Sequence, residues 1–143
     1  MKTSRTLVIE DNPADVTLLK IAFDRSQVET ELIFRNDGEA GIEYLNEQAK
    51  LEGKSGLPNL IILDLNLPKK SGREVLEYIK NSKELKHIPV IILSTSDVTR
   101  DIEDCYEFHA NSYLVKPNDF SVFQEMIDSL KDYWYLKNKQ PDK

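Results

Sequence analysis

Acidic, hydroxyl and ammonium side chains stand where the short apolar runs of this sequence end. Glu10 and Asp11 follow the first run, Asp64 follows a later one, Ser94 closes the next and Lys116 follows the last. Carboxylates brought together repel one another, because like unit charges about 4 Å apart cost about 1 kcal/mol in water and about 4 kcal/mol at an effective dielectric of roughly 20. Lys116 would balance one negative charge, and a hard divalent cation would balance two more. Mg²⁺ prefers a few carboxylate oxygens together with water, so these residues predict a Mg²⁺ site with a lysine beside it.

A carboxylate beside Mg²⁺ and a lysine can act as a nucleophile and form an aspartyl-phosphate. The two positive groups would neutralise the charge that develops on the transferred phosphoryl oxygens. Asp64 is the predicted acceptor, because it ends the central apolar run. Glu10 and Asp11 would hold the metal, and the backbone carbonyl of Asn66 would complete its shell. The hydroxyl of Ser94 would donate a hydrogen bond to a phosphoryl oxygen.

The side chains of that group can meet only if the apolar runs are neighbouring strands of one sheet. Apolar runs alternate with segments of helical apolar spacing along the chain, which is typical of a doubly wound parallel α/β sheet with helices on both faces. Two runs are apolar at every position, as in strands buried on both faces. Ligands bind such sheets beyond the carboxyl ends of the strands. We expect strands at 7–9, 31–35, 60–63, 89–93 and 112–115. We expect helices at 13–26, around 42–49, from 72, at about 98–108 and from about 119 past 130, with a loop at 50–58.

Length, charge and cysteine content narrow the class of protein. The chain has 143 residues, a formal net charge of −6 and a pI near 5.0, so it suits one domain and lacks the basic surface that nucleic acid binding needs. Cys105 is the only cysteine, which excludes an internal disulfide and a multi-cysteine zinc site. No apolar run reaches the roughly 18 residues of a membrane span, and the first run turns acidic too early for a signal peptide. We therefore expect a cytoplasmic protein that binds neither nucleic acid nor membrane.

Four motifs, in order, resemble the receiver (CheY-like) domain of bacterial two-component response regulators. They are Val8–Asn12, Leu63–Pro68 with Gly72 behind it, Pro89–Ser94 and Tyr113–Pro117. The resemblance covers about residues 5–132. It implies a flavodoxin-like (βα)5 fold, with a five-stranded parallel sheet of order 2-1-3-4-5. It also implies that the phosphohistidine of a cognate sensor histidine kinase donates its phosphoryl group to Asp64 in the presence of Mg²⁺, within a phosphorelay.

The same resemblance assigns the switch. Ser94 fills the place of the family's switch hydroxyl, Tyr113 fills that of the switch aromatic, and the Lys116–Pro117 bond is expected to be cis. After phosphorylation Ser94 would move toward the phosphoryl group and Tyr113 would rotate inward, which repacks a protein-contact surface. The chain departs from the family at Glu10, where aspartate is more usual. It departs again at Thr95, where a smaller residue is common and where threonine would narrow the access to the acceptor.

A narrower resemblance is to the single-domain regulators that are paired with bacterial phytochromes. It rests on the long loop near residues 47–58, the run Leu93–Ser96 and the aromatic pair Tyr133–Trp134. It implies a phytochrome-type kinase as the partner, with a histidine phosphotransfer protein as a further candidate. We expect a receiver domain over residues 1–136, a flexible tail over 137–143 and no output domain.

The last predicted helix carries two apolar stripes, whereas packing on one sheet face needs only one. The first stripe has the spacing of a core-facing side and consists of Phe120, Phe123, Ile127, Leu130 and Trp134. The second stripe consists of Val122, Met126 and Tyr133. We predict that the second stripe forms a homodimer or docking surface. The alternative is that its side chains fold back onto their own domain.

Two other functions compete with a phosphoacceptor switch. A phosphatase or phosphotransferase that uses an aspartyl-phosphate would need a general acid two residues after the nucleophile, and the amide of Asn66 cannot donate a proton as a carboxylic acid can. A receiver fold used only for binding, without phosphorylation, would not need the full set of acids with Lys116. His87 and His109 are expected to be solvated or capping residues, and Cys105 falls on the apolar side of its helix.

Overall fold

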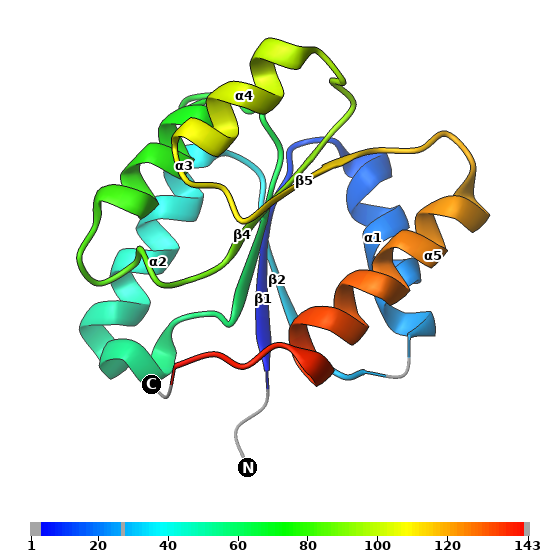
Figure 1. The fold of residues 1–143 in the computed structure, drawn as a ribbon. Helices are drawn as coiled ribbons and strands as arrows, with labels where there is room; N and C mark the ends of the chain where they lie inside the picture. Colours follow the sequence, from blue (N-terminus) through cyan, green and yellow to red (C-terminus); the bar gives the residue numbers. More distant parts are fainter. Residues whose placement is uncertain (1–3, 27, 142–143) are drawn as a thin grey trace.

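A five-stranded parallel sheet forms the centre of the molecule (Figure 1). The structure is a computed structural model and describes residues 4–26 and 28–141. The strands are ordered β2-β1-β3-β4-β5, which confirms the predicted flavodoxin-like topology. Their bounds are β1 Arg5–Ile9, β2 Glu31–Arg35, β3 Leu60–Leu63, β4 Val90–Ser94 and β5 Ser112–Val115.

Helices cover both faces of the sheet, with α1 and α5 on one face and α2, α3 and α4 on the other (Figure 1). Their bounds are α1 Pro13–Arg25, α2 Gly38–Glu52, α3 Gly72–Asn81, α4 Thr99–Glu107 and α5 Phe120–Lys131. A 3-10 turn, η1 Gly53–Gly56, follows α2, and a π-helical turn, η2 Asp132–Lys137, follows α5. This arrangement is the one expected of a chain in which strands and helices alternate.

The loop expected at 50–58 is wrong in its first part. Helix α2 continues to Glu52, because its last residues include no helix breaker. Gly53 then ends the helix with a φ of 62°, a conformation that glycine adopts without strain. The irregular segment between the helical turns and β3 is therefore short, and it begins only at Leu57.

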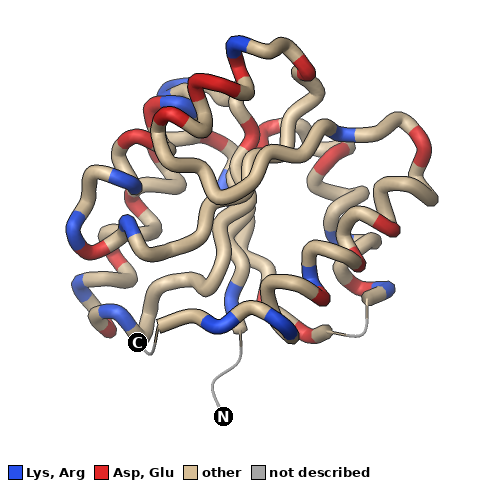
Figure 2. The backbone as a smooth tube through the Cα atoms, viewed as in Figure 1, with Lys and Arg blue, Asp and Glu red and all other residues tan. Residues whose placement is uncertain are grey.

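Strands β3 and β4 are buried along their whole length and are apolar except for Ser94, the last residue of β4. Neither β3 nor β4 carries a charged residue, and Figure 2 shows the Lys, Arg, Asp and Glu residues mainly on the helices and connecting segments. Alternate side chains of the inner strands face two separate cores. In the neighbouring β1, Ile9 packs on the side of Leu76, whereas Val8 packs on the side of Phe23 and Ile127. Burial on both faces fixes the depth at which each strand ends, and with it the position of the residues that follow.

Two helix starts lie close to the carboxyl ends of β1 and β3. Asn12 caps α1, since its side chain accepts hydrogen bonds from the backbone N–H groups of Ala14 and Asp15 at 2.9 and 3.2 Å. Pro13 occupies the first helical position, where its missing N–H is not needed. Both features favour a helix that begins at Pro13, as the sequence predicted, and they hold the first turn of α1 beside the end of β1.

Helix α3 begins directly against the end of β3. Ser71 caps it: its Oγ accepts a hydrogen bond from the backbone N–H of Glu74 at 3.2 Å, and its hydroxyl donates to Glu74 Oε1 at 3.4 Å. A Cβ atom on Gly72 would overlap the backbone carbonyl oxygen of Asp64. Only glycine therefore permits this approach of α3 to the strand end.

The two apolar stripes near the carboxyl-terminal end of the chain differ in burial. Members of the first stripe pack against the core, fully for Phe123, Ile127 and Leu130 and partly for Phe120 and Trp134. In the second stripe, Val122 and Tyr133 are 46% and 53% exposed. Met126, by contrast, packs partly against the core. The second stripe is therefore a surface at its two ends and is shared with the core in its middle.

Residues 138–141 run from η2 along the amino edge of the sheet toward the end of α2 (Figure 1). Gln140 and Pro141 border a small cavity together with Leu57 and His87. Residues 1–3 of the predicted domain and 142–143 of the predicted tail lie outside the described residues, and the flexibility of that tail stays a prediction. Within the described ranges, no helix has the length and apolar character of a membrane span.

The peptide bond between Lys116 and Pro117 corrects one expectation. No cis peptide bond occurs in the described part of the chain, so this bond is trans and the cis bond implied by the family resemblance is wrong. Trans is the lower-energy form of such a bond by about 0.5–1 kcal/mol.

Candidate functional site

Three carboxylates meet at the carboxyl edge of β1 and β3. Glu10 and Asp64 are only 3% and 8% exposed, whereas Asp11 is exposed. One oxygen from each of the three lies within 4.8 Å of the others. Strand pairing brings them together, because Ile9 and Leu63 are partners in the register of the sheet and the acids follow directly. The predicted convergence of these residues is therefore present in the structure.

The ammonium of Lys116 lies among these carboxylates. Its Nζ donates hydrogen bonds to Glu10 Oε1 at 2.6 Å, to Asp15 Oδ2 at 2.8 Å and to Asp64 Oδ2 at 3.3 Å. Its backbone N–H donates to the carbonyl of Ser94 at 2.7 Å, so the end of β4 sets the point from which the side chain starts. The side chain is 10% exposed. Lys116 is therefore a buried counter-charge to the acids.

Asp15 is a site residue that the sequence interpretation missed. It stands in the first turn of α1, four residues after Asp11. The available signal was weak, because acids are common in the first turn of any helix, where they interact favourably with the helix dipole. The contact with Lys116 depends on the angle at which α1 leaves β1, and the residue pattern does not specify that angle.

The surroundings raise the pKa values of both Glu10 and Lys116. The shift favours the neutral form of the glutamate and the charged form of the lysine. Burial, reinforced by the neighbouring Asp64, raises the pKa of Glu10 from 4.5 to about 7, although Lys116 acts in the other direction. Burial disfavours the ammonium of Lys116, yet hydrogen bonds to Asp15 and Glu10 and the charge of Asp64 together raise its pKa. The lysine therefore stays charged, and the acids around it carry more negative charge than one ammonium balances.

The donor atoms fit a hard divalent cation. The converging ligand atoms of Glu10, Asp11 and Asp64 are all carboxylate oxygens, which suits Mg²⁺ or Mn²⁺ better than the sulfur and nitrogen ligands typical of zinc. Asn66 lies next to this group, with its backbone N–H 3.4 Å from Asp64 Oδ1. A divalent cation held here would balance the surplus negative charge of the site.

The two predicted switch residues both bond to Ser96, in the connection between β4 and α4. Ser94 is fully buried, and its Oγ accepts a hydrogen bond from the backbone N–H of Ser96 at 3.2 Å. The hydroxyl of Tyr113 donates to the backbone carbonyl of Ser96 at 2.8 Å. Thr95, the neighbour of Ser94 that was expected to narrow the access to the acceptor, is exposed. Ser96 was not among the predicted site residues, because serine is common in loops and its type alone indicates no function.

Ser96 is tied in turn to two helices. Its hydroxyl donates to Asp101 Oδ2 at 2.6 Å, in the first turn of α4. Asp101 also forms an ion pair with Arg73 of α3, and Arg73 Nε lies 3.9 Å from Asp104 Oδ2. These contacts connect the switch residues with α3 and α4, outside the carboxylate group itself.

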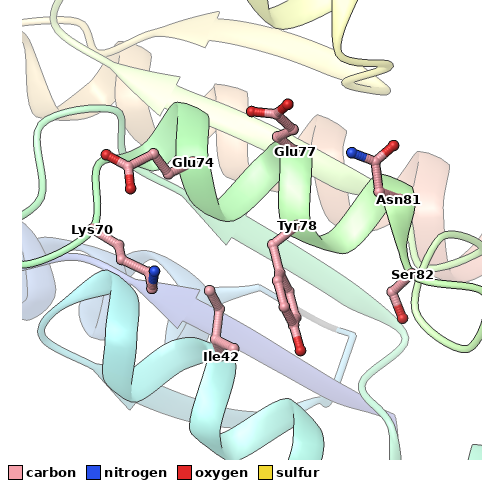
Figure 3. Close-up of a pocket in the computed structure, with 7 residues that line it drawn as sticks. All are labelled: Ile42, Lys70, Glu74, Glu77, Tyr78, Asn81 and Ser82. Atoms are coloured by element: carbon pink, nitrogen blue, oxygen red, sulfur yellow. The ribbon is translucent and has the colours of Figure 1, made fainter.

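A groove of 580 Å³ lies between α2 and α3, apart from the carboxylates (Figure 3). In it, Tyr78 reaches from α3 toward α2, where its hydroxyl accepts a hydrogen bond from Asn46 Nδ2 at 2.9 Å. The groove is lined by Ile42, Lys70, Glu74, Glu77, Tyr78, Asn81 and Ser82. These include none of the predicted site residues.

The two histidines also lie apart from the carboxylates. His87 borders the small cavity at the amino edge of the sheet. His109 follows α4 with a φ of 69°, and its backbone N–H donates to the carbonyl of Tyr106 at 2.9 Å. His109 therefore helps to end a helix, in agreement with the capping role that the sequence suggested. Cys105 is buried in the core beside α4, also as expected.

Sequence comparison relates this chain to known regulators. The family described as the response regulator receiver domain matches residues 6–128. Response regulator Rcp1 of Synechocystis sp. is 42% identical over 128 residues, which cover 90% of this chain and 86% of Rcp1. The probable methanogenesis regulatory protein FilR2 of Methanothrix harundinacea is 38% identical over 135 residues, which cover 94% of this chain and 86% of FilR2.

Solved structures agree with these relatives. The phosphorylated cyanobacterial phytochrome response regulator RcpA is 37% identical and superposes with a TM-score of 0.88, covering 99% of this chain and 100% of RcpA. The Mn²⁺-bound form of Rcp1 is 40% identical with a TM-score of 0.86, covering 97% of this chain and 99% of Rcp1. The predicted likeness to phytochrome-associated regulators is thereby confirmed. Since sequence, topology and site geometry all agree, this chain belongs to the family of response regulator receiver domains.

Proposed function

We propose that this protein is a phosphoacceptor switch of two-component signal transduction, with Asp64 as the acceptor. The observation that carries the proposal is the place of the Asp64 carboxylate, which lies beside the acids Glu10 and Asp11 and 3.3 Å from the ammonium of Lys116. A carboxylate so placed is a nucleophile whose phosphorylated form has a cationic partner at hand. Membership of the receiver family supports the same reaction.

In the proposed transfer, a carboxylate oxygen of Asp64 attacks the phosphorus of a phosphohistidine. A new O–P bond forms as the P–N bond breaks, and the imidazole leaves with the electron pair of that bond. The ammonium of Lys116 stabilises the charge on the phosphoryl oxygens. Glu10, Asp11, Asp64 and the backbone carbonyl of Asn66 would hold Mg²⁺, which supplies further charge neutralisation when it is bound.

The proposed signal is a change at Ser94 and Tyr113. The Oγ of Ser94 accepts its hydrogen bond from Ser96, which leaves the hydroxyl proton for donation to a phosphoryl oxygen. Movement of Ser94 toward the phosphoryl group would break the bond to Ser96, the same residue to which Tyr113 donates. The consequence would be a repacked surface around α4, β5 and α5 that changes a protein contact.

Phosphorylation with acetyl phosphate and Mg²⁺, followed by intact mass measurement, tests the acceptor. The wild type is expected to gain one phosphoryl group only when Mg²⁺ is present, and Asp64→Asn is expected to gain none. Asp128→Asn is the matched control, because Asp128 is an exposed acid of α5, and it should be phosphorylated like the wild type. A folded wild type that accepts no phosphoryl group from acetyl phosphate or from a panel of kinases would instead support a binding module.

A sensor histidine kinase of the phytochrome type is the proposed phosphoryl donor. The likeness to RcpA, a phytochrome response regulator, supports it. FilR2 is named for a different process, so the initial rate of transfer from phytochrome kinases should be compared with that from other kinases. Faster transfer from the phytochrome kinases is expected, and equal rates would contradict the proposal. A histidine phosphotransfer protein is the proposed onward acceptor, detected as loss of the phosphoryl group to it.

A switch is proposed rather than a phosphatase or phosphotransferase enzyme. The supporting residue is Asn66, which stands two residues after the acceptor, where such an enzyme would need a general acid. No repeated turnover of p-nitrophenyl phosphate is expected, beyond the single phosphoryl group that one Asp64 can hold. Release of many equivalents of p-nitrophenol, abolished by Asp64→Asn, would contradict the proposal.

The second stripe is proposed as a homodimer surface. Val122 and Tyr133 are its exposed members, and two copies would cover them together with the outer part of Met126. Sedimentation with and without beryllofluoride, a phosphoryl mimic, is expected to show a dimer that Val122→Glu weakens. Ser129→Glu, another exposed position of α5, is the control. An unchanging monomer under both conditions would exclude the dimer.

A further inference from the structure

The ammonium of Lys116 is shared among more carboxylates than the proposed phosphoryl transfer uses. An ammonium has three N–H donors, and here they meet Glu10 at 2.6 Å, Asp15 at 2.8 Å and Asp64 at 3.3 Å. The longest of the three contacts is the one to the acceptor. The ammonium is therefore held mainly by Glu10, directly after β1, and by Asp15 of α1.

We propose that Asp15 is a positioning residue that competes with the phosphoryl group for Lys116. The inference rests on the proposed function of Asp64 as a phosphoryl acceptor. By holding one donor of the ammonium, Asp15 weakens the retention of a phosphoryl anion at the site. By adding a negative charge, the same residue strengthens the binding of a divalent cation.

A count of charges supports these opposite effects. The charges of Glu10, Asp11 and Asp64 would be cancelled by Lys116 together with one divalent cation. Asp15 adds one negative charge to that balance, within 2.8 Å of the ammonium. An extra carboxylate attracts a cation and repels a phosphoryl group, because its negative charge interacts with the two in opposite directions. If Asp15 served packing alone, its substitution would not shift the affinities for the cation and for the phosphoryl group in opposite directions.

Asp15 can be changed without opening the core. Its side chain is 29% exposed, and its backbone N–H is held independently by the side chain of Asn12. Asp15→Asn keeps the shape of the residue and removes only its charge. Asp24→Asn is the matched control, because Asp24 is an exposed acid in the last turn of the same helix and its substitution removes the same charge.

Two binding constants of the full chain test the proposal. The affinity for Mn²⁺ is measured by electron paramagnetic resonance, and the affinity for beryllofluoride is measured by fluorine NMR at saturating Mg²⁺. For Asp15→Asn we expect Mn²⁺ binding to weaken and beryllofluoride binding to tighten, each about threefold to fivefold, as for one charge at a few ångströms in a solvated site. Asp15→Glu keeps the negative charge, so both of its binding constants are expected to be close to those of the wild type.

The outcomes separate this inference from the function on which it rests. Equal constants in Asp15→Asn and Asp24→Asn, or shifts of both affinities in the same direction, would overturn the role of Asp15 alone. A wild type that binds neither Mn²⁺ nor beryllofluoride would overturn the proposed phosphoacceptor function, and the role of Asp15 with it. Opposite shifts that Asp15→Glu reverses would establish the competition for Lys116.

Discussion

At the scale of single residues, the acceptor depends on one neighbour chosen for its size and another chosen for its charge. Gly72 lets α3 begin in contact with the Asp64 backbone, where any side chain would collide. Lys116 lets buried acids lie together by placing an ammonium between them. The two residues act on different properties, since the first fixes where the carboxylate stands and the second fixes how much charge can stand there.

Gly72→Ala is expected to lower the free energy of unfolding by about 1–3 kcal/mol, the usual effect of overpacking. The added methyl group would push the Asp64 backbone away, so the rate of phosphorylation by acetyl phosphate should fall as well. Urea unfolding and intact mass measure the two effects. Gly53→Ala is the control, because a Cβ there meets open space and only its φ of 62° is unfavourable. The control should lose stability without losing phosphorylation, and equal losses of phosphorylation would contradict the explanation.

The buried hydroxyl of Tyr135 should make the free energy of unfolding fall at alkaline pH. Burial raises the pKa of its hydroxyl, which is hydrogen-bonded to Thr6. The folded pKa lies above the unfolded one, so the unfolded chain ionises first as the pH rises through about 10. The contribution to stability is therefore complete below that pH and is lost above it.

The measurement is urea unfolding at about pH 8 and about pH 10.5. Tyr135→Phe is expected to reduce the fall in unfolding free energy between the two. Tyr106→Phe, at a tyrosine that is 48% exposed, should retain the fall of the wild type. The same fall in both variants would mean that the hydroxyl of Tyr135 is not the group responsible.

At the scale of elements, α4 has an uncapped start and a strained residue just after its end. Its start at Val98 has no side-chain capping hydrogen bond. Its end passes through His109, whose φ of 69° is unfavourable for any residue with a Cβ. The contacts of Asp101 with Ser96 and Arg73 are therefore important for holding this helix in place. A helix with an uncapped start suits a segment that has to repack when its neighbours change.

His109→Gly is expected to raise the free energy of unfolding by about 1 kcal/mol, because glycine adopts this backbone conformation without strain. Thermal or urea unfolding measures the change. Glu103→Gly, at an exposed position in the middle of the same helix, should instead lower stability by about 1 kcal/mol. If His109→Gly were destabilising, the imidazole itself would have to contribute more than the strain of its backbone.

At the scale of the whole molecule, two cores share one sheet. Trp134 packs against the core on the side of α1 and α5, and Cys105 is buried in the core on the other side. Because both cores are built on the same strands, neither can open by itself without exposing the opposite faces of those strands. We expect the two halves to unfold together.

Trp134 and Cys105 report on the two cores separately. The thiol of Cys105 is fully buried and burial raises its pKa, so it should react with an aromatic disulfide reagent only when its core opens. Fluorescence of Trp134 and reactivity of Cys105 are expected to change at the same urea concentration. Midpoints that differ would show that one face of the sheet loses its helices first.

The strands and the residues directly after them could be predicted from the sequence. Contacts that depend on the direction of a helix or of a connecting segment could not. Glu10 and Asp64 end apolar runs, and parallel strands carry their ends to one edge, so their meeting follows from the pattern alone. Asp15 and Ser96 lie in a helix turn and a connection, whose directions depend on packing against the rest of the fold. For the same reason the length of α2 was underestimated beyond residue 50, since its last turn has no apolar periodicity to indicate it.

Ser96 has a consequence for how the switch residues can move. One bond from its backbone N–H reaches Ser94, and one bond to its backbone carbonyl comes from Tyr113. The two groups belong to a single residue, so its two backbone dihedral angles govern both contacts. A shift of Ser96 that loosens its N–H contact with Ser94 also moves the carbonyl that accepts from Tyr113. The two switch contacts are therefore coupled through one residue, and displacements of Ser94 and Tyr113 should tend to occur together.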